Sequence, residues 1–242
     1  MFREYIKSHL NKFLRSFGVR MVSSRWGPRG FATAFESIRD QGFDLKNIWD
    51  VGASDASWTK ECREVFPMSD YFLFEPLKAH RNQLTAIGAT DSKIHFFPCA
   101  LGDTNGSAIL NAHKGQSSIL TSQEWKGHEE VISIMTADDV IKQTGIVPDC
   151  VKIDVQGYEL SLLRGFASNL RSCKFLLVEV SWIPLYENAP LADTIISFLA
   201  ANNFHIVDIC TYAQRPKDFR LTQSDVLFAN SETGLLSNTG WS

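Results

Sequence analysis

The sequence has no hydrophobic run long enough to cross a membrane. Its longest apolar stretches, such as FLLVEV at 175–180, are far shorter than the roughly 20 residues that a spanning helix needs. The first residues, MFREYIKSHLNKFLRSFG, alternate charged and apolar side chains, whereas a secretory signal has a continuous apolar core. We therefore expect a soluble protein of the cytoplasm.

Metal-binding cysteine pairs and a strongly basic surface are also missing. The five cysteines are far apart, none stands in a C-x-x-C pair and most have apolar neighbours, which is typical of reduced, buried thiols. The sequence has no D-x-D cluster and no closely spaced histidine pair, so we expect no metal site. The formal net charge of −3 at pH 7 is small and has the wrong sign for a nucleic-acid-binding protein.

What the sequence does contain is an alternation of strand and helix patterns. A chain of 242 residues with 44% hydrophobic residues can bury one sizeable core, so we expect one domain, 43–242, with a helical appendage at 1–42. Nearly all-apolar strands that alternate with helices favour a doubly wound α/β fold around a mostly parallel sheet. The strands are expected at 47–52, 70–76, 93–101, 150–155, 174–182, 203–209 and 224–230. Between residues 103 and 146 the alternation of strand and helix patterns breaks down, which we interpret as an insertion at the mouth of the sheet.

Residues 2–17 carry an apolar stripe at three- and four-residue spacing, and most of the basic residues lie off it. This pattern predicts an amphipathic helix. Such a helix packs on its own domain, pairs with a second copy, or makes weak contact with an anionic membrane surface, and the sequence leaves the three open.

The stretch NIWDVGASDASW at 47–58 places a glycine and several small residues directly after the first strand. In doubly wound sheets this turn meets the ligand, and Gly52, Ala53 and Ser54 leave room for one. A dinucleotide would require glycines in a G-x-G-x-x-G pattern, and only Gly52 is present. Asp50 and Asp55 would repel a pyrophosphate but attract the sulfonium and ammonium groups of S-adenosylmethionine. The turn therefore favours the methyl donor.

Further candidate cofactor residues follow the second and third strands. Glu75 ends the second strand about 20 residues after the turn, where an acid commonly accepts hydrogen bonds from a ribose diol. Pro76 stops that strand. Ala100 and Leu101, in the segment CALGD, could let an adenine ring lie against the backbone. A solvated or capping carboxylate and a plain strand exit remain the alternatives.

The sequence resembles the FkbM-type methyltransferases, a family of class I S-adenosylmethionine-dependent enzymes. The resemblance covers about residues 45–232 and rests on IWDVGASDASW, FLFEP, CALGD, GQSSIL, VKIDVQGYELSLLRGF, LLVEVSWIPLYENAP and QSDVLFAN. It implies a seven-stranded Rossmann-like sheet whose last strand is antiparallel, and methyl transfer to a hydroxyl of a sugar, glycolipid or polyketide-like acceptor. Two positions depart from the family pattern, because Ala56 and Gln156 stand where glycine and glutamate are common.

Methyl transfer to a hydroxyl requires a group that takes the proton, and three acids are candidates. Asp154 ends the fourth strand, Glu179 lies near the end of the fifth, and Glu159 lies one turn into the next helix; all are expected at the same crevice as Asp50 and Glu75. Alternatively Asp154 caps that helix and Glu179 pairs with Arg164.

Two other functions compete with the methyltransferase. An NAD-linked oxidoreductase or epimerase shares the fold but needs the missing glycines. A methyltransferase fold kept only as a binding module is suggested by Ala56 and Gln156, while Asp50, Gly52, Glu75 and Asp154 argue against it.

Overall fold

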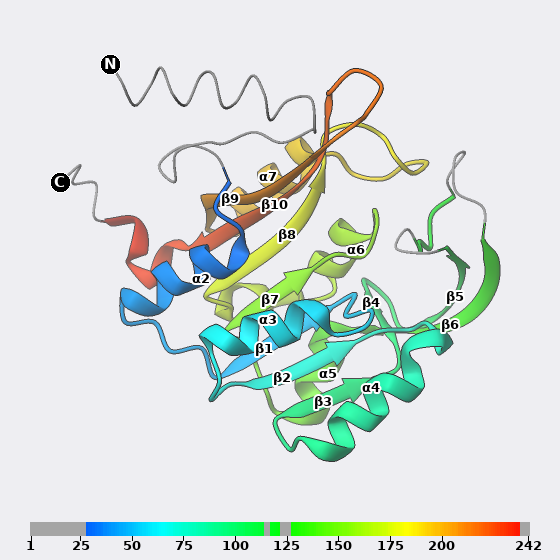
Figure 1. The fold of residues 1–242 in the computed structure, drawn as a ribbon, viewed down its shortest axis with the longest axis horizontal. Helices are drawn as coiled ribbons and strands as arrows, with labels where there is room; N and C mark the ends of the chain where they lie inside the picture. Colours follow the sequence, from blue (N-terminus) through cyan, green and yellow to red (C-terminus); the bar gives the residue numbers. More distant parts are fainter. Residues whose placement is uncertain (1–27, 114–116, 122–126, 238–242) are drawn as a thin grey trace, which may run out of the picture.

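The protein is described by a computed structural model that covers residues 28–113, 117–121 and 127–237 (Figure 1). At its centre is a seven-stranded sheet in the order β3-β2-β1-β7-β8-β10-β9. The strands are β1 (Asn47–Val51), β2 (Asp70–Phe74), β3 (Ile94–Phe97), β7 (Cys150–Ile153), β8 (Phe175–Ser181), β9 (Phe204–Gln214) and β10 (Leu221–Asn230). Every neighbouring pair up to β8 is parallel, and β10 runs antiparallel to both of its neighbours. The predicted doubly wound sheet with an antiparallel last strand is confirmed.

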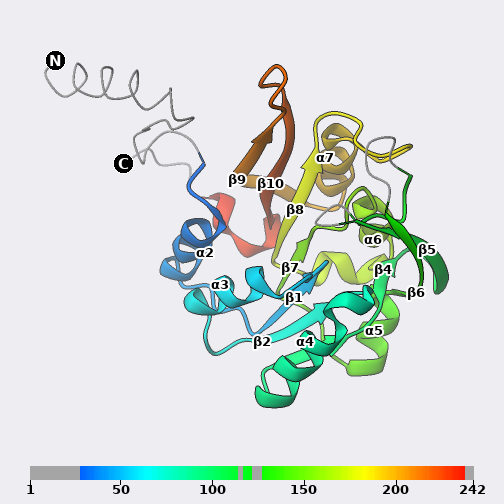
Figure 2. The ribbon, with the colours of Figure 1, turned by 45° about the vertical axis from the view of Figure 1, so that its right-hand side comes forward.

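Helices cover both faces of the sheet, as Figure 2 shows. Apolar side chains of α2 (Phe31–Asp40), α3 (Ser57–Val65) and α4 (Lys78–Thr90) join the core on one face. The other face is covered by α5 (Ala137–Thr144), α6 (Glu159–Arg164), α7 (Ala192–Ala201) and the short helix η2 (Ala167–Ser172). Two further short helices, η3 (Ser231–Thr233) and η4 (Leu235–Ser237), follow the last strand. Strands buried on both sides explain why their sequences are nearly all apolar.

The described part of the N-terminal appendage packs on the domain. Helix α2 buries Ala34, Phe35 and Ile38 against the core. Just before it, the Gly30 amide donates to the Cys210 carbonyl of β9 at 2.9 Å, and Arg29 forms an ion pair with Asp208 on the same strand. The amphipathic segment 2–17 lies outside the described residues, so its three possible roles stay predictions.

A second, smaller sheet consists of β4 (Ala100–Gly102), β5 (Gly106–Ala112) and β6 (His128–Thr136) in the order β4-β6-β5, with a small apolar core of its own. The predicted insertion, 103–146, supplies β5 and β6. The prediction of a single strand at 93–101 is wrong, because the central strand ends at Phe97, Pro98 lacks the N–H that would continue it, and β4 joins the small sheet. The backbone of α6 meets β4 so closely that a Cβ on Gly165 would lie 2.0 Å from the Gly102 carbonyl oxygen. This contact anchors the small sheet near the carboxyl ends of the central strands (Figure 1).

Among the described residues, no helix is both long enough and apolar enough to cross a bilayer.

Candidate active site

A cleft of about 870 Å³ opens at the carboxyl ends of the central strands. One wall comes from the turns after β1, β2 and β7 and from β4, and the other comes from β5, β6 and the described residues between them. The lining residues that the two walls contribute include Gly52, Ser54, Glu75, Pro76, Ala100, Leu101, Asp154, Gln156 and Tyr158 from the first, and Leu110, Ala112, His113, Ser117, His128 and Glu130 from the second. A ligand between these walls would therefore contact both sheets.

The turn after β1 holds an unusual backbone. Gly52, Ser54 and Ala56 all have positive φ angles, of 79°, 49° and 64°. The turn also passes close to β7, because a Cβ on Gly52 would lie 1.9 Å from the Asp154 carbonyl oxygen. Ala56 stands in the left-handed region just before α3, which explains why glycine suits that position. Non-glycine residues in such conformations are strained and gather at functional sites.

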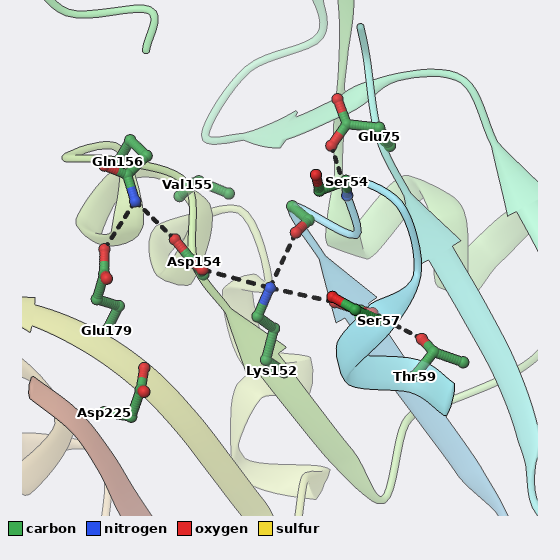
Figure 3. Close-up of polar contacts among 12 residues, drawn as sticks. Ser54, Ser57, Thr59, Glu75, Lys152, Asp154, Val155, Gln156, Glu179 and Asp225 are labelled. Carbon is green, nitrogen blue, oxygen red and sulfur yellow. Dashed lines mark hydrogen bonds and ion pairs between the residues drawn. The ribbon is translucent and has the colours of Figure 1, made fainter. Parts of the chain in front are cut away.

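Beneath this turn lies a buried ion pair. Asp50 is fully buried and accepts a hydrogen bond from the Thr59 hydroxyl at 2.6 Å. The Lys152 ammonium lies 3.3 Å from Asp50 Oδ1 and 3.5 Å from Asp154 Oδ2, and it donates to the Gly52 carbonyl at 2.9 Å (Figure 3). Burial disfavours the charge on Lys152, but the two aspartates more than offset it and raise the pKa of the lysine. Lys152 thus ties β1, β7 and the turn together.

Glu75 joins the turn to the end of β2. Its Oε2 accepts the Ser54 amide at 2.9 Å, and its Oε1 accepts the Leu77 amide at 2.8 Å. Burial raises the pKa of Glu75, although these two amides act in the opposite direction. A carboxylate has about four lone-pair positions, so both oxygens keep an acceptor position in the cleft wall.

Asp154 and Gln156 lie on the cleft wall after β7. Asp154 keeps 34% of its side chain exposed. Gln156, with a φ angle of 53°, donates from Nε2 to Asp154 Oδ1 and to Glu179 Oε2, both at 2.9 Å (Figure 3). Its Oε1 accepts the Tyr186 hydroxyl at 2.7 Å. The cleft-facing acid is therefore linked through one amide to an acid behind it.

Glu159 is buried and Glu179 is half-buried behind this wall rather than on it. Glu179 also accepts from Gln223 at 2.7 Å, and burial with the nearby charge of Asp154 raises its pKa well above the usual range. Glu159 accepts the Gly157 and Val155 amides at 2.9 and 3.3 Å, so it orders the loop into α6, and burial raises its pKa to about 7. No side chain caps the described α6, so Asp154 does not have the alternative capping role, and Glu179 bonds with Gln156 and Gln223 instead of Arg164.

These buried acids predict that the protein loses stability as the pH rises. A carboxyl whose pKa is higher in the folded than in the unfolded chain binds its proton more tightly in the folded chain. Its contribution to the free energy of unfolding is therefore complete at low pH and is lost as the pH rises through the folded-state pKa. For Glu159 the loss falls between about pH 4.5 and 7, and for Glu179 it extends beyond neutrality.

We expect Glu179→Gln to gain stability relative to the wild type as the pH rises from 6 to 9, by about 1.4 kcal/mol for each pH unit over which only the folded wild type holds the extra proton. Urea unfolding at pH 6, 7.5 and 9 measures this. The matched control is Glu129→Gln, which removes an exposed carboxylate from β6. Parallel stability curves for Glu179→Gln and the wild type would contradict the expectation.

The structure brings together most of the predicted site residues. Gly52, Ser54, Glu75, Pro76, Ala100, Leu101 and Asp154 all line the cleft. Asp50 and Ala53 do not, because Asp50 lies in the ion pair beneath the turn and Ala53 packs in the core. Glu159 and Glu179 also lie outside the lining. Within the described ranges, no group of three or more histidine, cysteine, aspartate or glutamate side chains is placed to hold a metal ion.

Sequence reasoning missed two residues that organise the site. Lys152 is the cation beneath the turn, and its signal was a charge inside the apolar strand segment CVKI. Gln156 had been noted only as a departure from a family pattern, and no sequence signal revealed its bonds to two acids. His113 and His128 also line the cleft, on the side of the small sheet.

A doubly wound sheet with an antiparallel last strand and a ligand-sized cleft over its first turn matches a Rossmann-like methyltransferase fold. Comparison with known proteins supports this class. Residues 50–206 match the family described as "Methyltransferase FkbM domain", and the chain belongs to that family. The matched range contains the turn after β1, Glu75 and the β7 wall.

Individual relatives agree with the family. The chain is 26% identical over 204 residues to the 2-O-methyltransferase NoeI of Sinorhizobium fredii, covering 76% of this chain and 79% of the relative. It is 23% identical over 182 residues to the hexuronic acid methyltransferase AglP of Haloferax volcanii, covering 72% and 73%. The crystal structure of methyltransferase FkbM from Methylobacillus flagellatus superposes with a TM-score of 0.53 at 16% identity, covering 84% of this chain and 48% of that one. The chain thus spans about half the length of that structure, and the match supports the fold.

Proposed function

We propose that the protein transfers the methyl group of S-adenosylmethionine to a hydroxyl oxygen of a sugar or sugar-like acceptor. The observation that carries the proposal is the cleft, in which the turn at Gly52, the acid Glu75 and the acid Asp154 face one space in a methyltransferase family fold. When bound, the cofactor supplies an electrophilic methyl group on a positively charged sulfur.

The residues of the first wall fit this cofactor. The close-packed backbone at Gly52 leaves no side chain between the turn and a ligand. Glu75 offers two acceptor positions for a ribose diol, and Pro76 and Leu101 supply apolar surface. Asp154 places a carboxylate where a cationic cofactor is attracted.

Asp154 is the proposed base for the acceptor hydroxyl. Among the three predicted catalytic acids, it lines the cleft, whereas Glu159 and Glu179 use their oxygens on internal donors. Lys152 and Gln156 hold its two oxygens, so its carboxylate has a fixed orientation. A positioned base of this kind typically accelerates proton removal by a factor of about 10² to 10⁴.

The second wall supports a hydroxyl-rich acceptor. It brings the polar side chains of His113, Ser117 and His128 to the cleft beside apolar Leu110 and Ala112. Hydrogen-bonding groups among apolar surface suit a sugar ring, which offers hydroxyls on its rim and C–H bonds on its faces. The named activities of the two relatives, a 2-O-methyltransferase and a hexuronic acid methyltransferase, support the same class of acceptor.

The first test is calorimetric titration of the purified protein with S-adenosylhomocysteine, the product of methyl transfer, with NAD as the control. We expect saturable binding of S-adenosylhomocysteine and none of NAD. Binding of NAD alone would overturn the proposal in favour of an oxidoreductase, and binding of neither by folded protein would favour a binding module.

Glu75→Gln tests the cofactor end of the cleft. The amide keeps one acceptor but turns the other oxygen into a donor, so it cannot hold both the Ser54 and Leu77 amides. We expect the affinity for S-adenosylhomocysteine to fall at least about tenfold, the cost of losing one good hydrogen bond to a charged group. Glu129→Gln on the outer side of β6 should bind as the wild type does, and equal affinity in both variants would refute the assignment of Glu75.

A further inference from the structure

Gln156 stands between two acids that would otherwise face each other across the end of the sheet. Both hydrogens of its amide nitrogen are used, one on Asp154 and one on Glu179, each at 2.9 Å. The Tyr186 hydroxyl donates to the amide oxygen at 2.7 Å, which fixes which end of the amide faces the acids. Ser118 also bonds the Gln156 carbonyl at 2.6 Å. The side chain is therefore held at both ends, and its left-handed backbone is held as well.

The charges around Glu179 do not balance if every acid is ionised. Asp225 lies opposite Glu179 on β10, Asp154 lies beyond Gln156, and Glu159 is close enough to raise its pKa. Lys152 is a cation near these acids, but it already forms an ion pair with Asp50. Tyr186 and Gln223 contribute only neutral donors, and Thr211 donates to Asp225. Burial and like charges both favour a proton on Glu179.

We propose that Gln156 is a positioning residue, an amide clamp that holds Asp154 Oδ1 at the cleft wall by bonding Asp154 and Glu179 through the two hydrogens of one amide nitrogen. The clamp has two effects. It orients Asp154 Oδ1, while Lys152 orients Oδ2, and it separates the carboxylate that faces the cleft from the acid that is buried. Without this separation, Asp154 and Glu179 would share one proton, as adjacent carboxyl groups do.

This inference rests on the proposed function for its catalytic meaning, because it assigns Asp154 the task of accepting the acceptor's proton. Its structural content is independent, since it concerns where protons lie in the protein without any ligand. A measurement on the ligand-free protein therefore tests the clamp even if the proposed function fails.

The experiment is a carbon-13 NMR titration of side-chain carboxyls in full-length, ligand-free protein, with Asp154→Asn and Glu179→Gln used to assign the signals. In the wild type we expect Glu179 to remain protonated at pH 7. In Gln156→Glu the donor becomes a third acid, so we expect the titration midpoint of Asp154 to rise by about one pH unit or more.

Gln223→Glu is the matched control. It introduces the same charge beside Glu179, because Gln223 Nε2 bonds the same oxygen at 2.7 Å, but in the part of the chain that the structure describes Gln223 makes no hydrogen bond with Asp154. If Gln156 is the clamp, Gln156→Glu should clearly shift the titration midpoint of Asp154, and Gln223→Glu should shift it much less. If both variants move Asp154 equally, or neither does, or wild-type Glu179 is ionised at pH 7, the inference is overturned.

If Gln156→Glu does not fold, Gln156→Met replaces it. The thioether has nearly the same length but donates no hydrogen bond, so the midpoint of Asp154 should still rise, by less than with glutamate. An unchanged midpoint in a folded Gln156→Met protein would overturn the inference.

Discussion

Replacing Gly52 with alanine is expected to lower the affinity for S-adenosylhomocysteine about a hundredfold and the free energy of unfolding by about 3 kcal/mol or more. Two costs add together. A φ angle of 79° is strained for any residue with a side chain, and the new methyl group would lie 1.9 Å from the Asp154 carbonyl oxygen. Either the turn or the end of β7 must move, and both line the cleft. Calorimetric titration and urea unfolding measure the two effects.

Gly145→Ala is the matched control for this prediction. Gly145 ends α5 with a φ angle of 72°, and a Cβ there would meet no atom within 4 Å. The Gly145→Ala variant has the backbone strain of a positive φ angle but no collision. It should therefore lower the free energy of unfolding by about 1 kcal/mol and leave the ligand affinity unchanged. Similar losses in the two variants would mean that the close approach to β7 is unimportant.

Replacing Lys152 with methionine should have the second large effect. The substitution keeps most of the buried stem but leaves Asp50, which is fully buried, without its cation. Removing one partner of a buried ion pair typically costs about 3–5 kcal/mol. The Gly52 carbonyl and Asp154 lose a donor as well, so we expect the turn after β1 to loosen and ligand binding to weaken.

The double variant Asp50→Asn with Lys152→Met separates charge from packing. If the uncompensated charge of Asp50 causes the loss, neutralising that side chain should recover a large part of the stability that Lys152→Met loses. The asparagine can still accept the Thr59 hydrogen bond. Urea unfolding of the wild type, the two single variants and the double variant gives the coupling energy between Asp50 and Lys152. Strictly additive losses of stability would refute the interaction between the two side chains.

The sequence predicted the central sheet well because burial on both faces leaves a strong pattern. Strand β7, with all four residues buried, was found from its apolar run and its place between turns. The turn at Gly52 was found from its small residues, and the position of Glu75 followed from the geometry of parallel strands. The small sheet was predicted only as an insertion, because its strands are partly exposed and lack a continuous apolar run.

The roles of individual acids could not be predicted in the same way. Asp50 and Asp154 both stand at the carboxyl end of a central strand, yet one is buried beneath the turn and the other faces the cleft. The difference depends on Lys152 and Thr59, which approach Asp50 from other elements. Sequence position gives the end of a strand, whereas partners distant in the sequence decide what the side chain does there.

The two walls of the cleft share the small sheet. The first wall includes Ala100 and Leu101 of β4, which pairs with β6 of the second wall. β5 is the edge strand of this sheet and pairs with β6, so it can change during evolution without breaking the pairing that holds β4 in place. A lineage could exchange Gly106–Ala112 and gain contacts with a new acceptor while β4 and β6 stay as they were, and a graft of this strand between relatives is the corresponding route for engineering.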